Sequence, residues 1–157
     1  MTNLTNPHDM IVWNRLVHDH EAFALTSTDF LTGDIDRVAV IQSALQGRGK
    51  QTAFYMLRSL NQSDLQGLFE ELVFHASYAH GALMVVRDSI LALPREWVLA
   101  RIEVIAEPLL ASGTYEEYRR LLELYALLDP LLTQRLAERA INHPHLDVQE
   151  AGHDFIR

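Results

Sequence analysis

Histidines and acidic residues gather near the start of the chain in a pattern that could bind a metal ion. The tetrapeptide His18-Asp19-His20-Glu21 sets imidazoles beside carboxylates, and both groups are good ligands for transition metals. Residues one or two positions apart point to different sides of a helix, so a site needs partners three or four residues away. The spacing therefore favours a solvated stretch of helix over a metal site.

Two further histidine patterns resemble halves of known metal centres. A His-Asp pair begins at His8, His18 and His153, as in helical metal phosphohydrolases, but those enzymes also need a histidine tens of residues upstream and a distant aspartate. Glu150 and His153 have the spacing of half a di-iron carboxylate site, and the sequence has no second Glu-x-x-His. We predict no metal, no cofactor and no catalytic residue. The alternative is a helical metal- or cofactor-dependent enzyme that uses histidines such as His18, His20 or His153.

Tyrosine and arginine side chains are the best candidates for binding. Tyr78 and Tyr115 fall outside the main apolar stripes, and Arg87 and Arg119 follow on later turns. These two residue types most often anchor protein interfaces, so we expect the four residues to form a binding face. The segment Gly47-Arg48-Gly49-Lys50 lacks the longer loop of a nucleotide site and follows no predicted strand, so we expect a turn there.

Helical signals run almost from end to end, and strand signals are nearly absent. Pro7 behind Asn6 predicts a helix start with a first-turn proline. Residues 26–33 are rich in Ser, Thr, Asp and Gly and predict a break. Pro108 falls inside an apolar helical pattern and predicts a kink or an early end.

Helix starts recur along the rest of the chain. Predicted capping boxes join Ser63 to Gln66 and Thr114 to Glu117, and Asp129 precedes a proline in the same way as Asn6. Helical hairpins are expected to begin at Asp34, Ser63, Pro94 and Pro130, with spacings of 29, 31 and 36 residues, in the range of helical repeats.

One hairpin cannot bury its own apolar stripe, so neighbouring hairpins must pack together. We expect an all-α protein of about eight to nine helices, built as a right-handed stack of antiparallel helical hairpins. The alternative is a compact helical bundle. Residues 1–157 are expected to form one helical-repeat domain, with an N-terminal helix and loop over 1–33 and four hairpins over 34–157.

The segment 130–152 resembles a HEAT-type repeat, with a turn at His143-Pro144 between two apolar-faced helices. Gln149 stands where the usual repeat has an arginine, and residues 68–93 and 97–128 resemble the repeat less closely. The repeat positions filled here are Leu132, Leu136, Ala140, Asp147, Val148 and Ala151. The resemblance to the HEAT/armadillo-like superfamily implies an α-solenoid scaffold that binds a partner along one ridge of helices, usually the second helix of each pair.

Composition limits the partner. The net charge of -8 disfavours generic binding to nucleic acids or anionic membranes. The absence of cysteine excludes disulfides and thiol chemistry. Residues 1–8 lack the features of a secretory signal, and no apolar run reaches the roughly 18 residues of a membrane span, so a cytoplasmic location is expected.

The sequence thus favours a non-enzymatic protein–protein interaction module. We expect an adaptor, or an acidic immunity or antitoxin-like protein whose partner has a basic surface. The chain is still apolar at Phe155 and Ile156, so self-association through the C-terminal helix is a further expectation.

Overall fold

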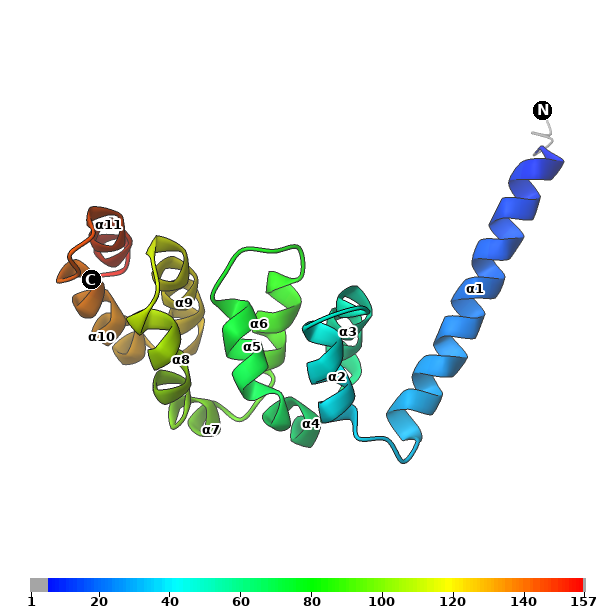
Figure 1. The fold of residues 1–157 in the computed structure, drawn as a ribbon, viewed down its shortest axis with the longest axis horizontal. Helices are drawn as coiled ribbons and strands as arrows, with labels where there is room; N and C mark the ends of the chain where they lie inside the picture. Colours follow the sequence, from blue (N-terminus) through cyan, green and yellow to red (C-terminus); the bar gives the residue numbers. More distant parts are fainter. Residues whose placement is uncertain (1–5, 157) are drawn as a thin grey trace. The chain divides into compact units, whose positions relative to one another are not determined.

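The computed structural model describes residues 6–156, and this part of the chain is helical and contains no strand (Figure 1). The all-α prediction is confirmed, but the described chain has eleven α-helices and one 3₁₀ helix, more than the eight to nine expected. They are α1 (Pro7–Thr32), α2 (Arg37–Leu45), α3 (Lys50–Met56), η1 (Leu57–Ser59), α4 (Gln62–Gly67), α5 (Phe69–Ala76), α6 (Leu83–Leu91), α7 (Arg95–Leu99), α8 (Ile102–Ala111), α9 (Tyr115–Leu128), α10 (Pro130–Ile141) and α11 (Leu146–Phe155). None of the described helices is both long and apolar enough to cross a membrane.

Contacts between Cα atoms divide the chain into two compact units. The first unit ends at Arg37 and contains α1, and the second begins at Val38 and contains the other helices. Each unit is described by itself below.

The first unit is dominated by α1, which begins as predicted. The Asn6 side chain accepts a hydrogen bond from the His8 N–H at 3.0 Å, and Pro7 occupies the first turn. The break predicted over residues 26–33 begins only at its last residue, because α1 continues to Thr32 and ends at Gly33. Hydroxyl groups in this stretch donate to carbonyls four residues earlier, as Ser27 does to Phe23 at 2.7 Å and Thr32 to Thr28 at 2.8 Å. These bonds satisfy the hydroxyl groups within the helix, so the polar side chains do not end it.

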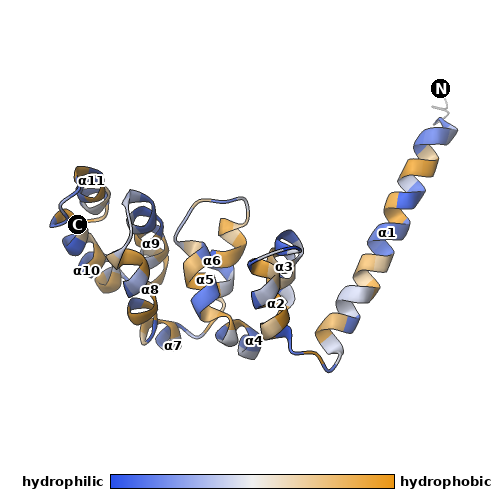
Figure 2. Cartoon of the chain, in the orientation of Figure 1, coloured by the Kyte–Doolittle hydropathy of each residue, from blue (hydrophilic) through white to orange (hydrophobic). Residues whose placement is uncertain are grey.

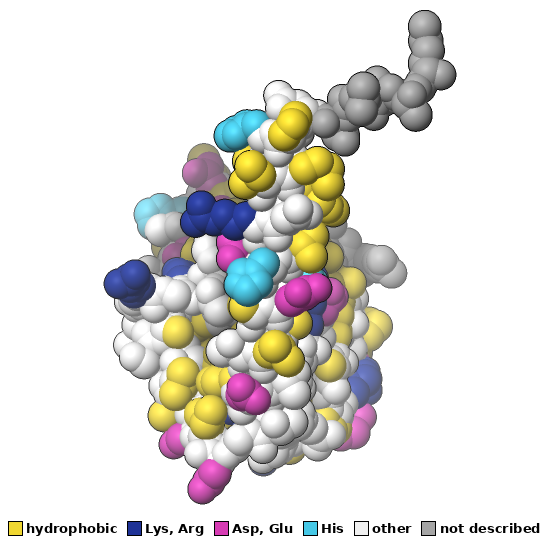
Figure 3. Space-filling view, turned by 90° about the vertical axis from the view of Figure 1, so that its right-hand side faces the viewer, with side chains coloured by type: hydrophobic (Ala, Val, Ile, Leu, Met, Phe, Trp, Pro, Cys, Tyr) yellow, Lys and Arg dark blue, Asp and Glu magenta, His cyan; other side chains and the backbone are white. Residues whose placement is uncertain are grey.

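No residue of α1 is buried. Large apolar side chains along it remain open, with Trp13 57% and Leu16 59% exposed. Hydrophobic side chains are visible along this helix in Figure 3, among histidines and charged groups.

The second unit contains the hydrophobic core. Apolar and polar residues both occur along its helices (Figure 2), and the buried residues are mainly the apolar ones. The close helix pairs include α5 with α6 and α8, and α9 with α10 and α11. The most deeply buried large side chains include Leu72, Ile90, Ile102, Tyr118, Leu122 and Leu132.

Helix starts in the second unit follow the predicted logic in part. The Thr114–Glu117 capping box is present, with the Thr114 N–H donating to the Glu117 carboxylate at 2.7 Å. The Ser63–Gln66 box is wrong: α4 begins at Gln62, and Asn61 caps it by accepting from the Asp64 N–H at 2.9 Å. The sequence Asn61-Gln62-Ser63-Asp64 offers two capping residues in competition, and the earlier one is used.

Pro108 does not end its helix, so an early end there is the wrong alternative. The helix α8 runs from Ile102 to Ala111 with Pro108 inside it. Proline lacks the N–H that would pair with the carbonyl of residue 104. Val104 is 78% exposed and Pro108 is exposed as well, so the missing hydrogen bond falls on the outer side of α8.

Ion pairs connect helices that are about one hairpin apart in sequence. On α8, Glu103 and Glu107 pair with Arg135 and Arg139 of α10, and each pair spans 32 residues. Arg95 pairs with Asp129 across 34 residues.

Candidate functional site

A groove of about 740 Å³ opens on the surface of the second unit. It is bordered by α5, by α8 and by the junction between α2 and α3. Its lining consists of Leu45, Gln46, Lys50, Glu70, Glu71, Phe74, His75, Val104, Ile105, Pro108 and Leu109. Sites for small ligands fall between about 300 and 1,000 Å³, so the groove is large enough to hold a short peptide segment.

One wall of the groove is apolar and open. Phe74 of α5 is 46% exposed and Val104 of α8 is 78% exposed, and Ile105 and Leu109 beside them are half-buried. Neighbouring exposed apolar side chains on a surface that also has a hollow are typical of binding sites. Phe74 is exposed because the buried stripe of α5 passes through its neighbours Val73 and His75.

Opposite charges lie at two places in the groove. Glu70 and Glu71 occupy the first turn of α5, where Gln46 donates to the Glu71 carboxylate at 3.3 Å. Lys50, the only lysine of the chain, is half-buried at the start of α3. Among residues 6–156 the Lys50 ammonium forms no ion pair, and it donates to the uncharged Tyr78 hydroxyl instead.

Hydrogen bonds join Lys50 to Tyr78 and His75, and join His75 to His80. The Lys50 Nζ donates to the Tyr78 hydroxyl at 3.4 Å, and the same hydroxyl is hydrogen-bonded to His75 Nδ1 at 2.6 Å. His80 Nε2 donates to the His75 carbonyl at 2.8 Å, and His80 Nδ1 accepts from the Ala82 N–H at 3.2 Å. These two bonds place a proton on His80 Nε2 and a lone pair on His80 Nδ1.

Burial keeps His75 uncharged. Removal from water, with the positive Lys50 and the neighbouring His80, lowers the pKa of His75 to about 4. Its ring packs edge-on against Phe54, with 5.2 Å between the ring centroids, and Phe54 also stacks on His80. At neutral pH the His75 ring is thus uncharged.

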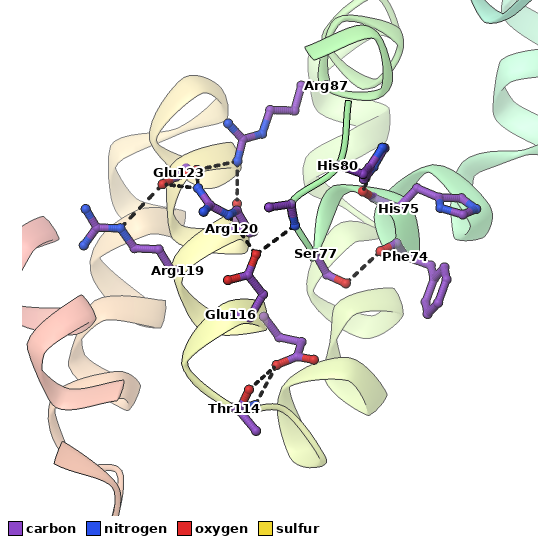
Figure 4. A network of polar contacts seen from close by, with 12 residues as sticks. Phe74, His75, Ser77, His80, Arg87, Thr114, Glu116, Arg119, Arg120 and Glu123 are labelled. Atoms are coloured by element: carbon purple, nitrogen blue, oxygen red, sulfur yellow. Dashed lines mark hydrogen bonds and ion pairs between the residues drawn. The ribbon is translucent and has the colours of Figure 1, made fainter. Parts of the chain in front are cut away.

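Two of the four predicted binding residues lie away from the groove and bind within the chain (Figure 4). Arg87 is 7% exposed and donates to Glu123 at 2.6 Å and to the Arg120 carbonyl at 3.3 Å. Arg119 lies 3.5 Å from the same Glu123 carboxylate and also pairs with Asp154. Burial alone would raise the pKa of Glu123, but hydrogen bonds from Arg87 and Arg120 outweigh it and the pKa is lowered. The Glu123 carboxylate therefore stays charged and joins α6 to α9.

The two tyrosines lie at separate places. Tyr78 lies in the loop after α5, and its hydroxyl is hydrogen-bonded to the Lys50 Nζ and to His75 Nδ1. Tyr115 is the first residue of α9 and is 39% exposed, one turn before Arg119. The Ala79 N–H donates to the Glu116 carboxylate at 2.8 Å, so the loop of Tyr78 and the start of α9 are neighbours.

The histidines named for a metal enzyme are scattered. His18 and His20 are exposed on α1, and His153 is exposed on α11. Residues 6–156 contain no group of three or more metal-binding side chains placed to hold an ion.

Sequence reasoning missed the groove itself. Its signal was present in Phe74 and Val104, which fall off the apolar stripes of their helices and so had to face outward. The pairing of α5 with α8, which brings the two side chains to one groove, cannot be seen in a local pattern.

Comparisons with protein-family models, with curated proteins and with solved structures give no match for this chain.

Proposed function

We propose that this chain is a non-enzymatic protein-binding module, and that the groove between α3, α5 and α8 is its binding site. The observation that supports the proposal most is the open apolar wall of Phe74 and Val104 beside the acidic pair Glu70 and Glu71. A wall of this kind gains free energy when a partner covers it, at about 25 cal/mol for each Å² of apolar surface removed from water.

The fold that we propose for the second unit is a short HEAT-like stack of helical hairpins. Two observations support it. The ion pairs from α8 to α10 and from Arg95 to Asp129 join segments 32 to 34 residues apart, which is about one hairpin. The close helix pairs involve elements near in sequence, such as α5 with α6 and α8, as expected when each hairpin packs on the next.

The partner in this proposal is another protein with a basic surface, bound by an adaptor or by an acidic immunity-like or antitoxin-like protein. Glu70 and Glu71 supply the local charge, and the net charge of -8 would speed the approach of a basic protein.

A capture experiment with matched variants tests this proposal. Tagged wild-type protein is incubated with lysate of the source organism, and the captured proteins are compared with those of Val104→Asp and Leu131→Asp. Leu131 is 66% exposed and Val104 is 78% exposed, so neither substitution should unfold the protein. Only Val104 lines the groove.

We expect one or more proteins to be captured by the wild type and by Leu131→Asp and to be lost with Val104→Asp. The same proteins should be lost with the double charge reversal Glu70→Lys and Glu71→Lys, and their capture should weaken as salt is raised. If Val104→Asp captures the same proteins as the wild type, the groove is not the binding site and the proposal fails.

A further inference from the structure

The charges in the groove indicate which part of a partner would bind there. The Lys50 ammonium is half-buried, lies beside the rings of Phe54 and Tyr78 at 5.8 and 6.0 Å from their centroids, and has no carboxylate partner among the described residues. Its hydrogen-bond partner is the uncharged Tyr78 hydroxyl, and a cation withdrawn in part from water without a carboxylate beside it favours an anionic ligand.

The acidic residues define the second position. The Tyr78 hydroxyl contacts both the Lys50 Nζ, at 3.4 Å, and His75 Nδ1, at 2.6 Å, so the Lys50 ammonium lies near His75. Glu71 and His75 are four residues apart on α5, which corresponds to about 6 Å along the helix axis. An extended peptide advances about 3.3 Å per residue, so an anion at Lys50 and a cation at Glu70 or Glu71 would be separated by about two residues of the ligand. Between them, side chains of the ligand would meet Phe74 and Val104.

The size of the groove favours a chain end over a passing segment. A hollow of about 740 Å³ is in the range of small-ligand sites and accommodates only a few residues. A chain end supplies its carboxylate from the backbone, so a short segment can present an anion, apolar side chains and one basic side chain together. Capture of a terminal carboxylate is a recurring mode of peptide recognition.

We propose that the groove binds the C-terminal end of a partner protein, with the terminal carboxylate at Lys50, apolar side chains against Phe74 and Val104, and a basic residue about two positions upstream at Glu70 and Glu71. This inference rests on the proposed function, because it names the part of the partner that the groove would hold.

The test uses the full chain and two defined probes. N-acetyl-Arg-Leu-Leu with a free carboxylate and the same peptide with a C-terminal amide are titrated into the protein, and binding is followed by calorimetry or by shifts in amide NMR signals. We expect the acid to bind about tenfold more tightly than the amide, the size of effect that one charge-assisted hydrogen bond supplies.

Variants then assign the effect to residues. Lys50→Met should bring the two affinities together, whereas Arg48→Met, which changes an exposed cation outside the lining, should keep the difference. Glu70→Gln with Glu71→Gln should weaken both peptides and leave their ratio unchanged. The comparison of acid with amide on the wild type needs no variant, so it stays valid if Lys50→Met does not fold.

Equal binding of acid and amide, or no binding of either at millimolar concentration, would overturn this inference. The proposed function has a separate readout, because loss of protein capture with Val104→Asp does not depend on the terminal carboxylate. If Val104→Asp abolishes capture while acid and amide bind equally, the groove is a protein-binding site for some other segment.

Discussion

Acidification should weaken the fold through His75, and the structure gives the size of the effect. The pKa of His75 is about 4 in the folded chain, because of its burial and the charge of Lys50, against 6.5 for an ordinary histidine. The unfolded chain therefore binds more protons than the folded chain between these two values, and the free energy of unfolding falls as the pH falls through this range. From pH 7 to pH 5 the two pKa values give a loss of up to about 2 kcal/mol.

Between pH 7 and pH 5 the loss of stability that comes from His75 can be told apart from the loss that comes from protonation of the carboxylates. Glu107 and Glu123 have lowered pKa values in the folded chain, so their contribution is present above the ordinary value of 4.5 and is lost only when the pH falls further. Urea unfolding of the wild type at a series of pH values within the window, followed by far-UV circular dichroism, measures the slope directly.

Two variants provide the comparison. His75→Gln removes the titrating group, so it should be less stable at pH 7 but should lose much of the slope between pH 7 and pH 5. His153→Gln removes an exposed histidine of α11 and should keep the wild-type slope. The reasoning is refuted if His75→Gln and the wild type lose the same free energy over this window.

Two further predictions concern packing and charge in the second unit. Gly152→Ala should destabilise the protein by about 1 to 3 kcal/mol, because the added Cβ would lie 2.9 Å from the Ala140 Cβ. Gly81→Ala should not destabilise it, because a Cβ at residue 81 has no atom within 4 Å. Chemical denaturation of the two variants measures the difference. Glu123→Ala should cost about 3 to 5 kcal/mol by leaving Arg87 buried without its carboxylate, and a fall of less than about 1 kcal/mol in the same assay would contradict the role assigned to this ion pair.

Local sequence signals predicted the helices well where one signal acted alone. Asn6 with Pro7 and Asp129 with Pro130 each began a helix, since a capping side chain and a first-turn proline have few other uses together. The signal failed at residues 26–33, where the same polar residues that favour a break can also bond back to the helix.

The candidate site was harder to predict because its residues come from three separate parts of the chain. Arg87 and Arg119 had the right chemistry for an interface. Arg119 and Glu123 are four residues apart on α9, so their contact follows from local spacing, but only the packing of α6 against α9 brings Arg87 to the same carboxylate. Lys50 falls in a predicted turn, and its neighbours Tyr78 and His75 are 28 and 25 residues further along the chain. Contacts between residues so far apart in sequence follow from the packing of helices and have no local signature.

The single lysine has a practical consequence for experiments. Every other basic side chain of the chain is an arginine, so Lys50 is the only side-chain primary amine. A reagent specific for amines therefore modifies side chains at one place only, and a ligand bound at Lys50 should protect that residue from modification, which mass spectrometry of the fragment that contains Lys50 would measure without any substitution. The natural protein can thus report on occupancy of its own candidate site.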